Sequence, residues 1–109
     1  MCSNTTVFSR QTGHSEIMHD DHHFLLNGLR WLWRYSPLKG TADGWTEFAK
    51  RKVLIDSRLR GRARLETECH EALHAILGPD IVSEECVTRS AHELSRVLWA
   101  LGYRLPPGP

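Results

Sequence analysis

Hydrophobic and polar positions divide this chain into a first half with strand periodicity and a second half with helical periodicity. Residues 29–35 partly alternate, with the aromatic side chains on one face and two arginines on the other. Residues 52–56 form a second apolar run of strand length, and residues 45–48 form a possible short strand. Pro37 and the glycine-containing stretch 40–44 interrupt the pattern as a loop. We therefore expect a small antiparallel sheet of two or three strands.

The second half begins with a predicted helix over residues 62–77. Gly61 interrupts the chain before it, and the pair Gly78-Pro79 ends it. Spacings of three and four residues place the apolar side chains of this helix on one side, namely Leu65, Cys69, Ala72, Leu73, Ile76 and Leu77. Such a stripe is typical of a helix that packs on a core.

A second helix is predicted to begin after Ser83, which has a side chain suited to capping a helix N-terminus. Gly102 suits the position just beyond its end. Its expected apolar stripe consists of Val87, Ala91, Leu94, Leu98 and Leu101. Because the connection between the helices is short, they should be antiparallel neighbours. The predicted fold class is α+β, with a small sheet packed on two antiparallel helices.

The chain is expected to contain one domain with a polar extension at each end. Residues 1–22 are polar and aperiodic, residues 23–104 carry the patterned elements, and residues 105–109 are rich in proline and glycine. The first segment contains the cluster His19-Asp20-Asp21-His22-His23. Its spacing matches no defined site, so we interpret it as a solvated surface segment.

Composition narrows the classes of function only modestly. The formal net charge is +1, which predicts no charged partner for the molecule as a whole. No apolar run approaches the roughly 18 residues of a membrane span, and the N-terminus lacks a signal-peptide layout. The three scattered cysteines do not form a disulfide framework, so a reducing cytoplasm is the expected setting.

The sequence His70-Glu71-Ala72-Leu73-His74 is the main indication of chemistry. It reads H-E-x-x-H within the first predicted helix. Imidazoles four residues apart lie on one helical face, where both can bind one Zn²⁺ ion. The glutamate between them can act as general base toward a water on that ion. The pattern predicts a zinc site with Glu71 as the catalytic residue.

A catalytic zinc needs a third protein ligand, and the neighbouring second helix is expected to supply it. Glu85 is the favoured ligand, because it lies away from that helix's own apolar stripe and near the level of His74. Glu84, Glu93 and His92 remain open as alternatives. Acidic residues in a first helical turn also complement the helix dipole without binding a metal.

Roughly residues 28–104, and most densely residues 52–104, resemble a known group of enzymes. The strand ending at Asp56, the basic junction Arg60-Gly61-Arg62, the H-E-x-x-H helix and the later Glu84-Glu85-Cys86-Val87 segment are similar to small phage-encoded metallopeptidases. These are related to the ImmA/IrrE-like and SprT-like zincins. The resemblance implies a minimal zincin-like fold, with His70 and His74 as zinc ligands, Glu71 as base and an acidic ligand from residues 84–85.

The predicted function is therefore zinc-dependent hydrolysis of peptide bonds in a protein or peptide substrate, in the host-cell cytoplasm if the chain is phage-encoded. The strand at 52–57 is expected to flank the substrate cleft, and Arg89, Tyr35 or His92 could stabilise the oxyanion. The alternative is a zinc-stabilised binding or virion-associated module without turnover. The basic residues within 50–64 could contact nucleic acid, but a solvated loop and helical turn are favoured.

Overall fold

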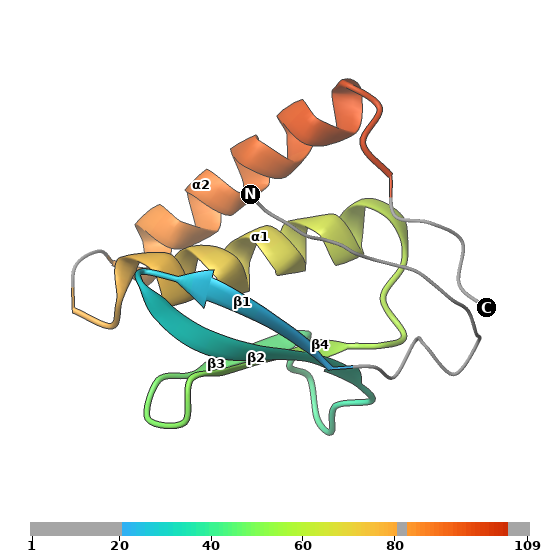
Figure 1. Ribbon diagram of the computed structural model, residues 1–109. Helices are drawn as coiled ribbons and strands as arrows, with labels where there is room; N and C mark the ends of the chain where they lie inside the picture. Colours follow the sequence, from blue (N-terminus) through green and yellow to red (C-terminus); the bar gives the residue numbers. More distant parts are fainter. Residues whose placement is uncertain (1–20, 81–82, 105–109) are drawn as a thin grey trace.

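The computed structural model describes residues 21–80 and 83–104, and it confirms the α+β class (Figure 1). The strands and helices, in chain order, are β1 (His22–Leu26), β2 (Leu29–Ser36), β3 (Gly44–Glu47), β4 (Lys52–Asp56), α1 (Gly61–Leu77) and α2 (Glu84–Ala100). The sheet lies on one side of α1 and α2 lies on the other, so α1 is the middle of three layers (Figure 1).

The three predicted strands are present, but a fourth strand, β1, was not predicted. It pairs with β2 as an antiparallel hairpin. Asn27 and Gly28 form the turn with φ of 53° and 75°, and these positive values are those of a tight type I′ turn. The Asn-Gly pair is the sequence signal that could have revealed this hairpin. Since β1 begins at His22, the sheet begins one residue inside the segment expected to be a polar arm.

The expectation of a purely antiparallel sheet is wrong, because the strand order is β1-β2-β4-β3. After β2 the chain passes to β3 and turns back into β4, which inserts between β2 and β3. As a result β4 runs parallel to β2 and antiparallel to β3. Val53 and Ile55 of this central strand are fully buried. β1 and β3 are left as the two edges of the sheet.

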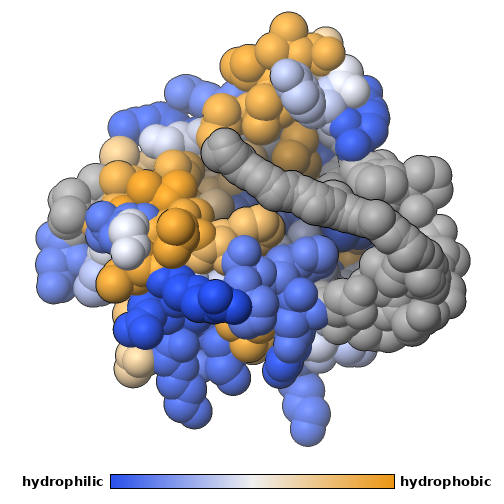
Figure 2. Space-filling view, in the orientation of Figure 1, coloured by the Kyte–Doolittle hydropathy of each residue, from blue (hydrophilic) through white to orange (hydrophobic). Residues whose placement is uncertain are grey.

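The core lies between the sheet and α1. Trp31 and Trp33 are buried with Val53, Ile55 and Ala75, as the aromatic face of β2 predicted. Aromatic side chains supply a large apolar area each, which allows so small a domain to form a core. Figure 2 shows hydrophobic side chains gathered over β1 and the helices, with hydrophilic side chains over the lower part of the same view.

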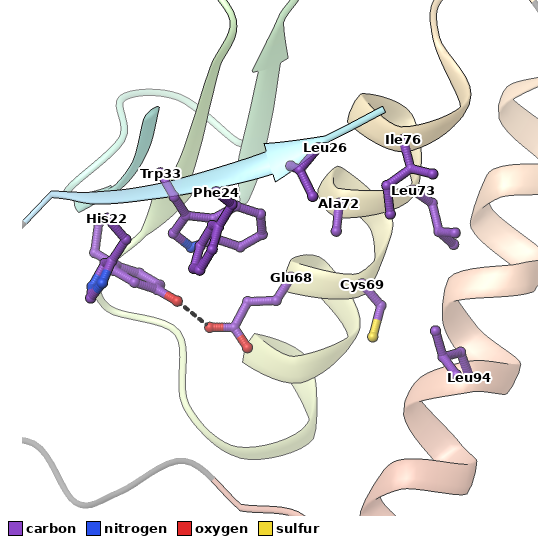
Figure 3. Close-up of a pocket in the computed structure, with 11 residues that line it drawn as sticks. His22, Phe24, Leu26, Trp33, Glu68, Cys69, Ala72, Leu73, Ile76 and Leu94 are labelled. Carbon is purple, nitrogen blue, oxygen red and sulfur yellow. Dashed lines mark hydrogen bonds between the residues drawn. The ribbon is translucent and has the colours of Figure 1, made fainter. Parts of the chain in front are cut away.

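Helix α1 has almost the predicted bounds, but its buried residues include only Cys69 of the predicted stripe. Cys69, Glu71 and Ala75 are buried, whereas Ile76 is exposed. Much of the predicted stripe instead lines an open apolar cavity of about 430 Å³ between β1, α1 and α2 (Figure 3). The cavity lining consists of His22, Phe24, Leu26, Trp33, Tyr35, Glu68, Cys69, Ala72, Leu73, Ile76 and Leu94.

Helix α2 begins and ends as predicted. The Ser83 side chain accepts a hydrogen bond from the Cys86 amide at 3.1 Å, and Gly102 adopts a φ of 96° just beyond the C-terminus. Val87 and Ala91 are buried, but the predicted stripe does not continue, because Leu94 and Leu101 are exposed. The two helices diverge toward the C-terminus of α2 (Figure 1). No helix in the described part of the chain has the length and apolar character needed to span a membrane.

Candidate metal centre

The site is built on the C-terminal half of α1. His70 and His74 lie one turn apart, with ring centroids 4.9 Å apart and their Nε2 atoms 3.2 Å apart. Both side chains are about one-fifth exposed, so they stand at the edge of the core and not within it. The helix therefore brings two imidazole nitrogens to one point, as the four-residue spacing predicted.

Glu84, the first residue of α2, completes the group. Its two carboxylate oxygens lie 2.9 Å from Nε2 of His70 and 2.7 Å from Nε2 of His74. The Ser83 cap sets where α2 begins, and so sets where this carboxylate stands relative to α1. Among the described residues, His70, His74 and Glu84 are the group whose side-chain atoms come close enough to hold a metal ion.

The donor set fits zinc. Two imidazole nitrogens and one carboxylate oxygen are the ligand types of catalytic zinc sites. Tetrahedral zinc with bonds of about 2.0–2.1 Å holds its ligand atoms roughly 3.3 Å apart. The observed separations of 3.2, 2.9 and 2.7 Å are close to that spacing. Small side-chain adjustments would accommodate an ion at this point.

The structure places Glu84 where Glu85 was the favoured third ligand. Glu85 is exposed, and neither it nor Glu93 belongs to the group of possible ligands. The physical reason is that α2 packs on α1 through its own buried side, which carries Val87. Glu84 is three residues before Val87 and lies on that side, whereas Glu85 is turned about 100° further around the helix. The requirement that the ligand point away from the apolar stripe therefore selected the glutamate that lies outside the group of possible ligands.

The three possible ligands stand at a cleft of about 240 Å³. Its lining comes from α1, from the start of α2 and from β3 with the turn after it, namely Gly44, Trp45, Thr46, Phe48, His70, Glu71, His74 and Glu84. The strand beside the cleft is thus β3, and not the predicted segment 52–57. β4 is central and paired on both sides, whereas β3 has one edge without a neighbouring strand in the sheet.

Glu71 points from α1 toward β3. It is only 8% exposed, and a buried carboxylate needs a hydrogen-bonding partner. Thr46 provides one, since its hydroxyl lies 2.5 Å from Oε1 of Glu71. Gly44 leaves room for this arrangement, because a methyl group at that position would stand 2.8 Å from Cγ of Glu71. The sequence reading missed both residues.

The three residues considered as oxyanion donors do not line this cleft. The hydroxyl of Tyr35 donates to Glu68 at 2.6 Å beside the apolar cavity, and this is the hydrogen bond drawn in Figure 3. Nδ1 of His92 lies 3.3 Å from Glu66. Burial, followed by the charge of Glu68, raises the pKa of Tyr35 to about 12, so its phenol stays neutral.

Two other sequence features have structural contacts of their own. In the histidine-rich cluster, Asp21 accepts two hydrogen bonds from Arg34, at 2.7 and 2.8 Å. His19 and Asp20 of that cluster lie outside the described residues. In the basic segment 50–64, Arg58 is paired with Asp56 at 2.7 Å and Arg64 with Glu68 at 3.2 Å. These contacts favour a structural use of such cations over phosphate binding.

Comparison of the chain with protein-family models, with curated proteins and with solved structures finds no match in any of the three.

Proposed function

We propose that this protein is a zinc-dependent metallopeptidase in which His70, His74 and Glu84 hold the ion and Glu71 is the general base. The observation that carries the proposal is the convergence of three possible ligands at a cleft that also contains Glu71. Three protein ligands leave one position of a tetrahedral ion open, which is the arrangement of catalytic zinc. A structural zinc would need a fourth protein ligand.

The chain's own residues supply the remaining parts of a hydrolytic reaction. A zinc ion in the site would activate a water molecule and polarise the carbonyl under attack. Glu71 accepts the proton of that water and later passes it to the leaving amine. The free edge of β3 can pair with an extended peptide and so present its carbonyl to the cleft.

The resemblance to small phage-encoded zincins supports the same assignment, because it favours an acidic ligand from residues 84–85. The free thiols of Cys69 and Cys86 support a reducing compartment such as the host-cell cytoplasm.

The first step of the test is metal content. Protein purified without a histidine tag should contain close to one zinc ion per chain, and His74→Ala should lose it. His92→Ala is the matched control, because His92 is also helical but contacts Glu66 and not the cleft. Zinc that persists in His74→Ala, or disappears equally in both variants, would contradict the proposed site.

The second step is hydrolysis of fluorescein-labelled casein, an unfolded protein chain. The zinc-loaded wild type should cleave it, and Glu71→Gln should keep its zinc while losing cleavage by at least about a hundredfold. Equal cleavage in the two proteins, or none in either, would refute the peptidase. Zinc binding without any cleavage would favour the alternative function, a binding module that zinc stabilises and that has no turnover.

A further inference from the structure

We propose that Thr46 is a positioning residue that fixes the carboxylate of Glu71 toward the metal centre, and that Gly44 provides the space for it. This inference rests on the proposed function, because it assigns to β3 a role in positioning Glu71 as the general base. The edge strand would then do more than bind substrate.

The geometry points to one donor and one acceptor oxygen. The Thr46 hydroxyl lies 2.5 Å from Oε1 of Glu71 and 3.2 Å from the Glu71 carbonyl oxygen. A hydroxyl has a single proton to donate, and the shorter contact to a carboxylate is the stronger one. Oε1 is therefore committed to Thr46. The other oxygen, Oε2, takes no part in that hydrogen bond and, on a residue that lines the cleft, is the oxygen we assign to accept a proton.

The donor stands on a rigid element. Thr46 is paired with Val53 in the β3–β4 ladder, so its backbone is fixed by the central strand. Threonine is branched at Cβ, which restricts its side chain to few orientations. A catalytic carboxylate keeps its geometry best when its partner is itself held in place. Glu71 is thus held from β3 as well as from its own helix.

Gly44 makes the close approach possible. Residues two apart on a strand point to the same face, so Gly44 and Thr46 both face α1. A methyl group on Gly44 would stand 2.8 Å from Cγ of Glu71, 2.8 Å from Cγ2 of Thr67 and 3.0 Å from Oε2 of Glu71. Any larger residue at position 44 would push away the carboxylate that Thr46 holds. On β3, the glycine therefore provides the space for the Glu71 side chain, and the threonine two residues later provides its hydrogen-bond donor.

The test uses acetohydroxamic acid, a zinc-binding probe that must give up its hydroxyl proton when its oxygen bonds to the ion. The nearby Glu71 carboxylate is the acceptor for that proton. Thiocyanate serves as the reference probe, because it binds zinc without releasing a proton. Affinities for both probes are measured by calorimetry on the zinc-loaded wild type, Thr46→Val, Thr46→Ser and Glu71→Gln.

We expect Thr46→Val to weaken hydroxamate binding about tenfold, the scale of one hydrogen bond to a charged group. Thr46→Ser, which keeps the hydroxyl, should bind within about twofold of the wild type on the same scale. Zinc content should be the same in all four proteins, and thiocyanate affinity should be the same in the wild type and the two Thr46 variants, which carry the same charge. A Thr46→Val protein that binds hydroxamate as well as the wild type overturns the role of Thr46, as does a Thr46→Ser protein that is weakened equally.

The two proposals fail in different ways. If Glu71→Gln weakens hydroxamate binding and Thr46→Val does not, Glu71 keeps its role and only the positioning by Thr46 is refuted. If Glu71→Gln leaves hydroxamate binding unchanged, or none of the proteins holds zinc, the proposed function itself fails and the inference falls with it.

Discussion

The choice between Glu84 and Glu85 as zinc ligand can be tested with two variants that differ only in position. Glu84→Gln and Glu85→Gln remove the same charge from the first turn of α2, so both lose the same kind of interaction with the helix dipole. Only Glu84 has oxygens within 2.9 Å of both histidines. A difference in zinc binding between the variants therefore reports ligation and not helix stability.

The size of the effect follows from linkage between binding and folding. At free zinc 100 times the Kd, binding to the folded state alone adds about 2.7 kcal/mol to the free energy of unfolding. For a chain of 109 residues this raises Tm by roughly 10 °C. If the loss of the Glu84 carboxylate weakens zinc about a hundredfold, the same zinc concentration adds only about 0.4 kcal/mol. The Tm of Glu84→Gln would then rise by roughly 2 °C.

The assay is thermal unfolding in a zinc buffer and again with excess chelator, and the quantity compared is the zinc-induced change in Tm. We expect nearly the full shift for the wild type and Glu85→Gln, and a small one for Glu84→Gln. A full shift for Glu84→Gln with a lost shift for Glu85→Gln would restore the sequence prediction and refute the assignment from geometry. Full shifts in both variants would show that neither glutamate binds the ion.

Three further predictions concern the frame around the site. Gly44→Ala should lower the free energy of unfolding, measured in urea, by about 1–3 kcal/mol through overpacking. The added substitution Thr67→Ser removes the crowded Cγ2 and should restore part of the lost stability. Ser83→Ala should lower the free energy of unfolding by about 1 kcal/mol in the same assay and weaken zinc binding, whereas Ser83→Asp, which keeps a capping side chain, should lose less of both. Equal losses in the two variants would contradict a capping role. The fold raises the pKa of Tyr35 to about 12, so between about pH 10 and 12 the phenol ionises more readily in the unfolded chain. The free energy of unfolding should therefore fall as pH rises from about 10 to 12. The fall should be smaller in Tyr35→Phe, and equal declines would refute the link.

The elements that could be predicted from the sequence are those specified by neighbouring residues. Both helices follow from periodicity with capping residues, and Ser83 and Gly102 adopt the roles that their side chains indicate. β4 has its predicted bounds, because its short apolar run lies between polar segments. The insertion of β4 between β2 and β3 has no such local signature, and it alone decides that β3 is the edge beside the cleft. Strand order depends on which pairings bury most surface, which a single sequence does not display.

The site shows the same distinction between local and distant specification, at the level of side chains. His70 and His74 meet because a helix has a fixed rise and turn, so their spacing is sufficient to predict the meeting. Which glutamate lies beside the two histidines depends on which side of α2 faces α1, and a rotation of about 100° about the helix axis separates two adjacent residues. Thr46 reaches Glu71 across 25 positions of sequence through the β3–β4 ladder. A threonine two residues after a glycine has no chemical signature of its own, and it becomes informative only when the fold sets it against a buried carboxylate. Residues that position another side chain are therefore the hardest to find from sequence, because their residue type is common and only their place in the fold is distinctive.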